Sequence, residues 1–223
     1  MLLIEVSKEL AKPLSRHVYS KSRPNINLQP DLLWNADIAQ IGSNACVVAQ
    51  EQYTNYILVL CGLDKDDFAQ FPLLFTDRLW REAVAICEQA NLYERSILSR
   101  HLKQIFDSQS YRLNPEPLEE GKLLNVIEKL ERRFLYDKEP LPMDGKSAFE
   151  YTFPINTRKP KSQQQNDQPS AVEALGNYCL NLVEHSVENQ PAEPDPVIST
   201  TDNRQPTTDN RQPTTDNRQP TTL

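Results

Sequence analysis

Catalytic and cofactor-binding signatures are absent from this sequence. Only five of its 223 residues are glycines, and none of them forms a phosphate-binding loop, a dinucleotide fingerprint or a nucleophile elbow. The three histidines and four cysteines do not have the spacing of a metal site. The sequence therefore predicts no cofactor and no metal centre, and it favours a protein that is not an enzyme.

Long hydrophobic runs are also absent. No stretch approaches the roughly 20 apolar residues of a membrane span. The apolar segment at the N-terminus is interrupted by Glu5 and is too short for a signal peptide. The cysteines, Cys46, Cys61, Cys87 and Cys179, lie mostly within apolar runs, which is typical of reduced and buried thiols. The sequence thus predicts a cytoplasmic protein that does not enter a membrane.

An excess of positive charge is missing as well. Residues 1–160 carry 20 Lys and Arg against 22 Asp and Glu, whereas residues 161–223 carry 4 against 9. A nearly neutral body argues against non-specific binding to nucleic acid, which requires clustered basic residues. One alternative stays open, because the fold could gather seven basic residues into a patch. These are Arg16, Lys21, Arg23, Arg132, Arg133, Arg158 and Lys159.

Three strands joined by short turns are predicted over 34–41, 45–50 and 53–61. The third is apolar on both faces, so we expect it in the middle of a sheet, covered by helices on both sides. Further strands are expected at 2–6 and 109–113. Alternating apolar residues predict an edge strand at 149–153 that ends at Pro154.

Apolar residues at helical spacing predict three long helices, over about 72–91, 93–105 and 115–135. His101 lies near the inner face of the second, and we interpret it as a packing residue rather than a ligand. The acidic run 64–67 fits either a helix N-cap or a metal-binding cluster, and the N-cap is favoured. The predicted fold class is α+β (α/β-type), a small antiparallel or mixed sheet packed with about three helices in a domain at 1–157.

A last amphipathic helix is predicted at 170–188, after a polar linker at 158–169. It begins with a capping-box pattern, Ser170 followed by Glu173. An isolated helix of this length is marginally stable in water, so it should dock on the domain or bind a partner. The apolar residues expected to bind that partner are Val172, Leu175, Cys179 and Leu182.

The tail at 189–223 contains three identical copies of Thr-Thr-Asp-Asn-Arg-Gln-Pro. The repeat has no apolar position, which excludes a coiled coil, and a proline in every copy blocks a long helix. Because it has too little apolar surface to form a core, we predict that the tail is disordered.

Three segments carry a resemblance. Ser-Lys-Glu-Leu at 7–10 follows the opening strand, Trp-Asn-Ala at 34–36 and Thr-Asn-Tyr-Ile-Leu at 54–58 form a core block, and Tyr-Thr-Phe-Pro-Ile stands at 151–155. Together they resemble a small uncharacterised bacterial family, often found on mobile elements and plasmids, over about residues 1–157. The family has basic residues in its first turn, where this chain has Gly-Ser-Asn, and Glu51 replaces a usual Asn. The resemblance implies a fold and no established activity.

Three functions follow from these observations. The favoured one is a non-enzymatic interaction module that binds a protein partner through the 170–188 helix or the sheet surface. The first alternative is an enzyme with a small-molecule substrate, in which Asp37 acts as the base and a tyrosine as the acid or nucleophile. The second is a nucleic-acid-associated protein of mobile elements. The candidate catalytic residues are Asn35, Asp37, Tyr53, Thr54 and Tyr56. The two tyrosines and Thr54 are also typical strand residues.

Overall fold

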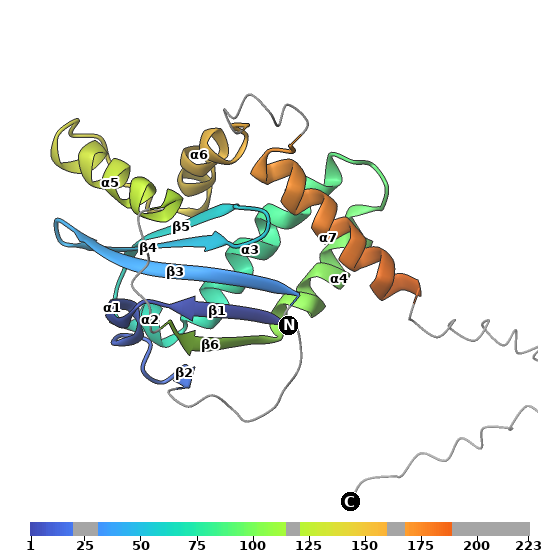
Figure 1. The fold of residues 1–223 in the computed structure, drawn as a ribbon, viewed down its shortest axis with the longest axis horizontal. Helices are drawn as coiled ribbons and strands as arrows, with labels where there is room; N and C mark the ends of the chain where they lie inside the picture. Colours follow the sequence, from blue (N-terminus) through green and yellow to red (C-terminus); the bar gives the residue numbers. More distant parts are fainter. Residues whose placement is uncertain (20–30, 115–120, 160–167, 189–223) are drawn as a thin grey trace, which may run out of the picture. The chain divides into compact units, whose positions relative to one another are not determined.

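The computed structural model of the protein describes residues 1–19, 31–114, 121–159 and 168–188. Contacts between residues divide the chain after Gln190, and every described residue lies in the first unit, Met1–Gln190. This unit contains a mixed sheet with helices on both faces (Figure 1). The predicted α+β class is therefore confirmed. The tail at 189–223 and most of the linker, at 160–167, lie outside the described residues.

The sheet has six strands in the order β2-β6-β1-β3-β4-β5. β1 pairs in parallel with β3 and β6, β2 pairs in parallel with β6, and β3, β4 and β5 form an antiparallel meander. Gly42, with a φ angle of 62°, allows the tight loop between β3 and β4. The strands are β1 (Leu2–Val6), β2 (Val18–Tyr19), β3 (Leu32–Ile41), β4 (Asn44–Glu51), β5 (Ile57–Leu63) and β6 (Gln109–Leu113).

β5 differs from the prediction in two ways. It begins at Ile57 rather than at residue 53, and it lies at the edge of the sheet rather than in the middle. Both of its faces are nevertheless buried, one towards α3 (Phe71–Glu88) and one towards α6 (Gly145–Asn156). The side-chain amide of Asn156 pairs with the backbone of Ile57 at the free edge of β5. It accepts from the N–H of Ile57 at 2.8 Å and donates to the carbonyl of Ile57 at 2.8 Å.

Two hydrophobic cores lie on the two faces of the sheet. One is formed with α3, α4 and α7, and Figure 1 shows α3 behind the strands. The other is formed with α5 and α6. Within the described ranges, no helix combines the length and the apolar character that crossing a membrane requires. The remaining helices are α1 (Lys8–Ala11), α2 (Lys65–Ala69), α4 (Arg95–Asp107), α5 (Lys122–Leu135) and α7 (Ala171–Glu188).

The predicted edge strand at 149–153 is wrong, because these residues belong to α6. Asp144 and Ser147 form a capping box that starts the helix. The alternating apolar residues were ambiguous, since Phe149 and Phe153 are also one helical turn apart, and their ring centroids lie 5.3 Å from each other. Pro154 lies inside the helix and does not end it.

α7 docks on its own chain. The backbone N–H of Ser170 donates to Glu173 Oε2 at 2.7 Å, and that of Glu173 donates to Ser170 Oγ at 3.2 Å, which confirms the capping box. The apolar face of the helix packs against α3 and α4. Of the four residues predicted to bind a partner, Val172, Leu175 and Cys179 are buried and Leu182 is partly buried. This face is therefore occupied within the chain.

Candidate functional site

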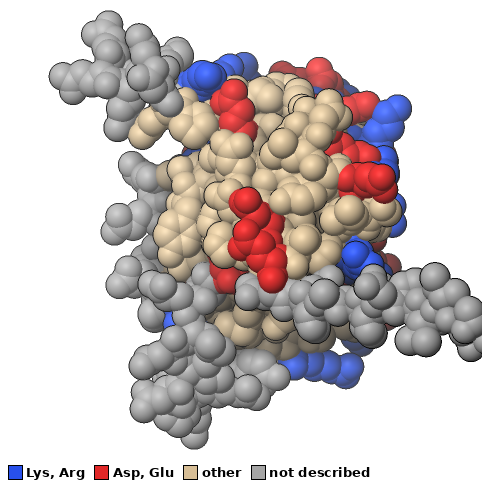
Figure 2. Space-filling model, turned by 90° about the vertical axis from the view of Figure 1, so that its right-hand side faces the viewer, with Lys and Arg blue, Asp and Glu red and all other residues tan. Residues whose placement is uncertain are grey.

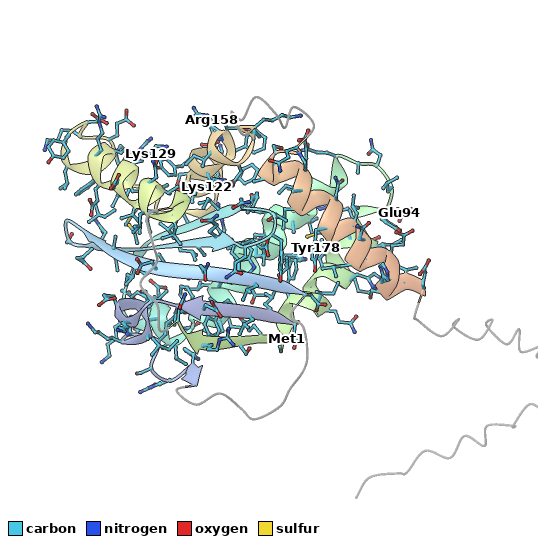
Figure 3. The ribbon with its side chains drawn as sticks, viewed as in Figure 1. Met1, Glu94, Lys122, Lys129, Arg158 and Tyr178 are labelled. Atoms are coloured by element: carbon cyan, nitrogen blue, oxygen red, sulfur yellow. The ribbon has the colours of Figure 1, made fainter. Side chains whose placement is uncertain are left out.

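A cleft of about 690 Å³ opens beside the antiparallel half of the sheet. Its walls are the turn at 53–55 between β4 and β5, the start of α5, the end of α6 with the residues that follow it, and the start of α7. Figure 3 shows Lys122 and Lys129 on α5 and Arg158 near the end of α6, all on this side of the molecule. The cleft thus brings together segments that are far apart in the sequence.

The turn that carries Tyr53 and Thr54 is held by a buried carboxylate. Glu51, the last residue of β4, has no exposed surface. Its Oε2 accepts from the backbone N–H of Tyr53 at 2.9 Å, and from the N–H and Oγ1 of Thr54 at 2.6 and 2.8 Å. Asn55 completes the turn with a φ angle of 60°. The backbone of Tyr53 is consequently fixed, whereas its ring is 67% exposed at the cleft.

Four basic side chains line the cleft, and none of the described residues that line it is acidic. Lys122 Nζ donates to the carbonyl of Asn55 at 2.7 Å, and burial lowers the pKa of Lys122. Lys159 Nζ lies 3.7 Å from Glu173 Oε2 at the edge of α7. Considering only the described part of the chain, Lys129 and Arg158 form no ion pair. We call this site, with Lys122, Lys129, Arg158 and Lys159, the cationic cleft.

The cationic cleft is suited to an anion. Its positive charges are only partly balanced, and the N-terminal turn of α5 adds backbone N–H groups because Gly121 provides no side-chain cap. A divalent metal ion would instead require oxygen ligands such as carboxylates. The acidic run considered as a metal cluster has another role, since Asp64 accepts from the backbone N–H groups of Asp66 and Asp67 as a helix N-cap. No group of residues suited to a metal occurs in the ranges that the structure describes.

Tyr53 and Thr54 are the only two of the five predicted catalytic residues that line the cationic cleft. Tyr56, three residues further, points into the core beneath α3, where its hydroxyl donates to Glu82 Oε2 at 2.6 Å. Glu82 forms an ion pair with Arg78, and Arg78 donates to the carbonyl of Gly145. We call Tyr56, Arg78 and Glu82 the buried ionic cluster.

Burial dominates the chemistry of the buried ionic cluster. It raises the pKa of Tyr56, and the negative charge of Glu82 raises it further. It also raises the pKa of Glu82, although the charge of Arg78 acts in the opposite direction. These contacts hold Tyr56 in its neutral form, and they join α3 to the segment that leads into β5.

Asn35 and Asp37 lie on the other face of β3 from Trp34 and Ala36, which pack towards α3. Asn35 Oδ1 accepts from Gln52 Nε2 at 3.3 Å. Asp37 Oδ1 accepts from the backbone N–H of Ile38 at 2.8 Å. The five candidates are therefore divided among three places, and Asp37 does not meet either tyrosine.

The predicted basic patch is also divided. Arg158 and Lys159 reach the cationic cleft. Arg133 instead pairs with Glu139 at 2.9 Å and lies over the ring of Tyr151. Lys21 and Arg23 lie outside the described residues. On the face that carries α4 and α7, acidic groups lie near the middle and basic groups near the margins (Figure 2), so no broad basic surface appears there.

Lys122 and Lys129 were missed as site residues. The sequence places them among mixed charges on the outer face of a helix, where charged residues are usually only solvated. A spacing of seven residues, with Asn125 and Val126 between them, does place both on one face of α5, and that was the one available signal.

Comparison with known proteins supports the resemblance for part of the chain. No curated protein and no solved structure matches the sequence. The closing motif at 151–155 lies outside the segment that a family model matches. Residues 3–95 match the model of a family described as a domain of unknown function, DUF6933.

Proposed function

We propose that this chain is a non-enzymatic binding module that holds a small anionic ligand in the cationic cleft. The observation that carries the proposal is the imbalance of charge in the cleft, where four basic side chains meet no acidic residue among the described lining residues. Unpaired cations at a partly enclosed surface attract phosphate and carboxylate groups. A volume of about 690 Å³ suits a small molecule.

The placement of the other candidates favours this proposal over the alternatives. A protein partner at the apolar face of α7 would have to displace α3 and α4, because Leu175 and Cys179 have no exposed surface. An enzyme using Asp37 and Tyr56 would need residues that lie on opposite faces of the sheet to act together. The other candidate tyrosine, Tyr53, lines the cationic cleft, which Asp37 does not line. A bacterial origin, a cytoplasmic location and a link to mobile elements remain predictions from the sequence.

The proposal is tested by titrating inorganic pyrophosphate into the full chain and measuring heat of binding. We expect saturable binding at one site by the unmodified protein. Arg158→Glu and Lys129→Glu each replace an unpaired cation by an anion, so each should weaken binding by at least about tenfold. Folding should be unaffected, since both side chains are at the surface of the cleft.

The matched control is Arg100→Glu, which makes the same change of charge at an exposed position on α4. It should leave pyrophosphate affinity within about twofold, because distant exposed charges are screened by salt. Absence of pyrophosphate binding, or equal losses for Arg100→Glu and Arg158→Glu, would contradict a specific anion site.

A further inference from the structure

The shape of the cationic cleft points to a more specific ligand. We propose that it binds a nucleoside polyphosphate, with the phosphates among the basic side chains and the base on the ring of Tyr53. This inference rests on the proposed function and names the ligand class for the same site. Three features carry it, namely the spread of the cations, the position of the ring and the polar side chains around it.

The cations are spread along the cleft and do not all come from one element. Lys122 and Lys129 are seven residues apart on α5, which corresponds to about 10 Å along the helix axis. Arg158 approaches from the end of α6, on another wall of the cleft (Figure 3). A chain of two or three phosphates matches the length of such a row better than a single phosphate does.

Tyr53 provides a platform for an aromatic base. It is the one aromatic side chain among the described residues that line the cleft, and its ring is 67% exposed. Ordering a mobile exposed ring costs binding free energy when a ligand stacks on it. Here the hydrogen bonds to Glu51 already fix the backbone that carries the ring. Any nucleobase can stack on such a ring, because stacking uses the face of the base and not its hydrogen-bonding groups.

Polar groups complete the site. Asn125 and Gln168 line the cleft from α5 and from the segment before α7. Each amide offers both a donor and an acceptor, which is what the edge of a base or a ribose hydroxyl requires. The cleft therefore presents cations, amides and an aromatic face, and a nucleotide is the class of small molecule that uses all three.

The test compares ADP with inorganic pyrophosphate, which carries the same number of phosphates but no base. Both are titrated calorimetrically into the full chain and into Tyr53→Ala. We expect the unmodified protein to prefer ADP, and Tyr53→Ala to lower ADP affinity by about tenfold through loss of stacking. Pyrophosphate affinity should stay unchanged in that variant. Tyr53→Phe keeps the ring and should retain ADP binding.

Tyr136→Ala is the matched control, because Tyr136 is 78% exposed at the end of α5 and does not line the cleft. It should bind ADP as the unmodified protein does. Equal affinities for ADP and pyrophosphate, or equal losses of both in Tyr53→Ala, would overturn the nucleotide proposal and leave the anion site intact. Binding of neither ligand would overturn the proposed function itself. If a single-stranded oligonucleotide binds more tightly than ADP, with a strong dependence on salt, the ligand of the cleft is a nucleic acid and not a free nucleotide.

Discussion

Two tyrosines only three residues apart, Tyr53 and Tyr56, belong to two opposite kinds of environment. Tyr56 joins the buried ionic cluster, where Glu82 and Arg78 pair with each other and with neighbouring groups. Tyr53 stands at the cationic cleft, where Lys129 and Arg158 have no ion-pair partner among the described residues. The same residue types therefore stabilise the fold in one region and remain available to a ligand in the other, because burial and pairing differ.

The strongest test of this contrast is Arg78→Ala. Removing the guanidinium leaves the Glu82 carboxylate buried without its ion-pair partner and removes the hydrogen bond to the Gly145 carbonyl. The free energy of unfolding, measured by urea denaturation at pH 7, should fall by about 3–5 kcal/mol.

Arg81→Ala is the matched control for Arg78→Ala. Arg81 lies on the same helix and pairs with Asp77 at 2.8 Å, but both side chains are mostly exposed. Its replacement should lower the unfolding free energy by less than about 1 kcal/mol. If the two variants lose equal stability, the buried ionic cluster does not hold the fold as we infer.

A smaller effect is expected where the two regions meet. Asn156 bonds the edge of β5, and two residues later Arg158 enters the cationic cleft. Asn156→Ala leaves the N–H and the carbonyl of Ile57 without their partner, so the free energy of unfolding should fall by about 1–3 kcal/mol. Thr157→Ala, which alters an exposed neighbour, should change it by less than about 0.5 kcal/mol in the same urea titration. Equal effects would contradict a specific role for the amide.

Much of the fold follows from local patterns in the sequence. The periodic apolar residues of α3, α4 and α7, the caps at Asp64 and Ser170 and the β3–β4 hairpin all depend on neighbouring residues. The two wrong predictions, the strand at 149–153 and the central position of β5, depend on contacts between residues that are far apart in the sequence. The pattern at 149–153 fits a strand or a helix, and β5 resembles a central strand because α6 covers it. Only tertiary contacts distinguish these cases.

The site was less predictable than the fold. The sequence predicts Tyr53 and Thr54 as polar candidates near the end of a strand, and both do line the cationic cleft. The role of Lys122 and Lys129 depends instead on how α5 lies against the turn at 53–55 and the end of α6, which no spacing in the sequence specifies. Glu51 departs from the Asn that is usual at this position in the family that the sequence resembles. In the structure, its carboxylate holds the turn that presents Tyr53.

The least disruptive test changes only the pH. Burial lowers the pKa of Lys122, so this cation becomes neutral within a range below the ordinary lysine pKa of 10.5. The charge of ADP does not change at alkaline pH, because ADP is already fully ionised. Its affinity should fall as the pH rises through that range, because Lys122 loses its positive charge. Stability should change in the opposite direction, because Lys122 stays protonated in the unfolded chain and the unfolded state then binds more protons. Lys122→Met should abolish both trends in calorimetric and urea titrations. A pH-independent affinity in the unmodified protein would show that Lys122 does not contact the ligand.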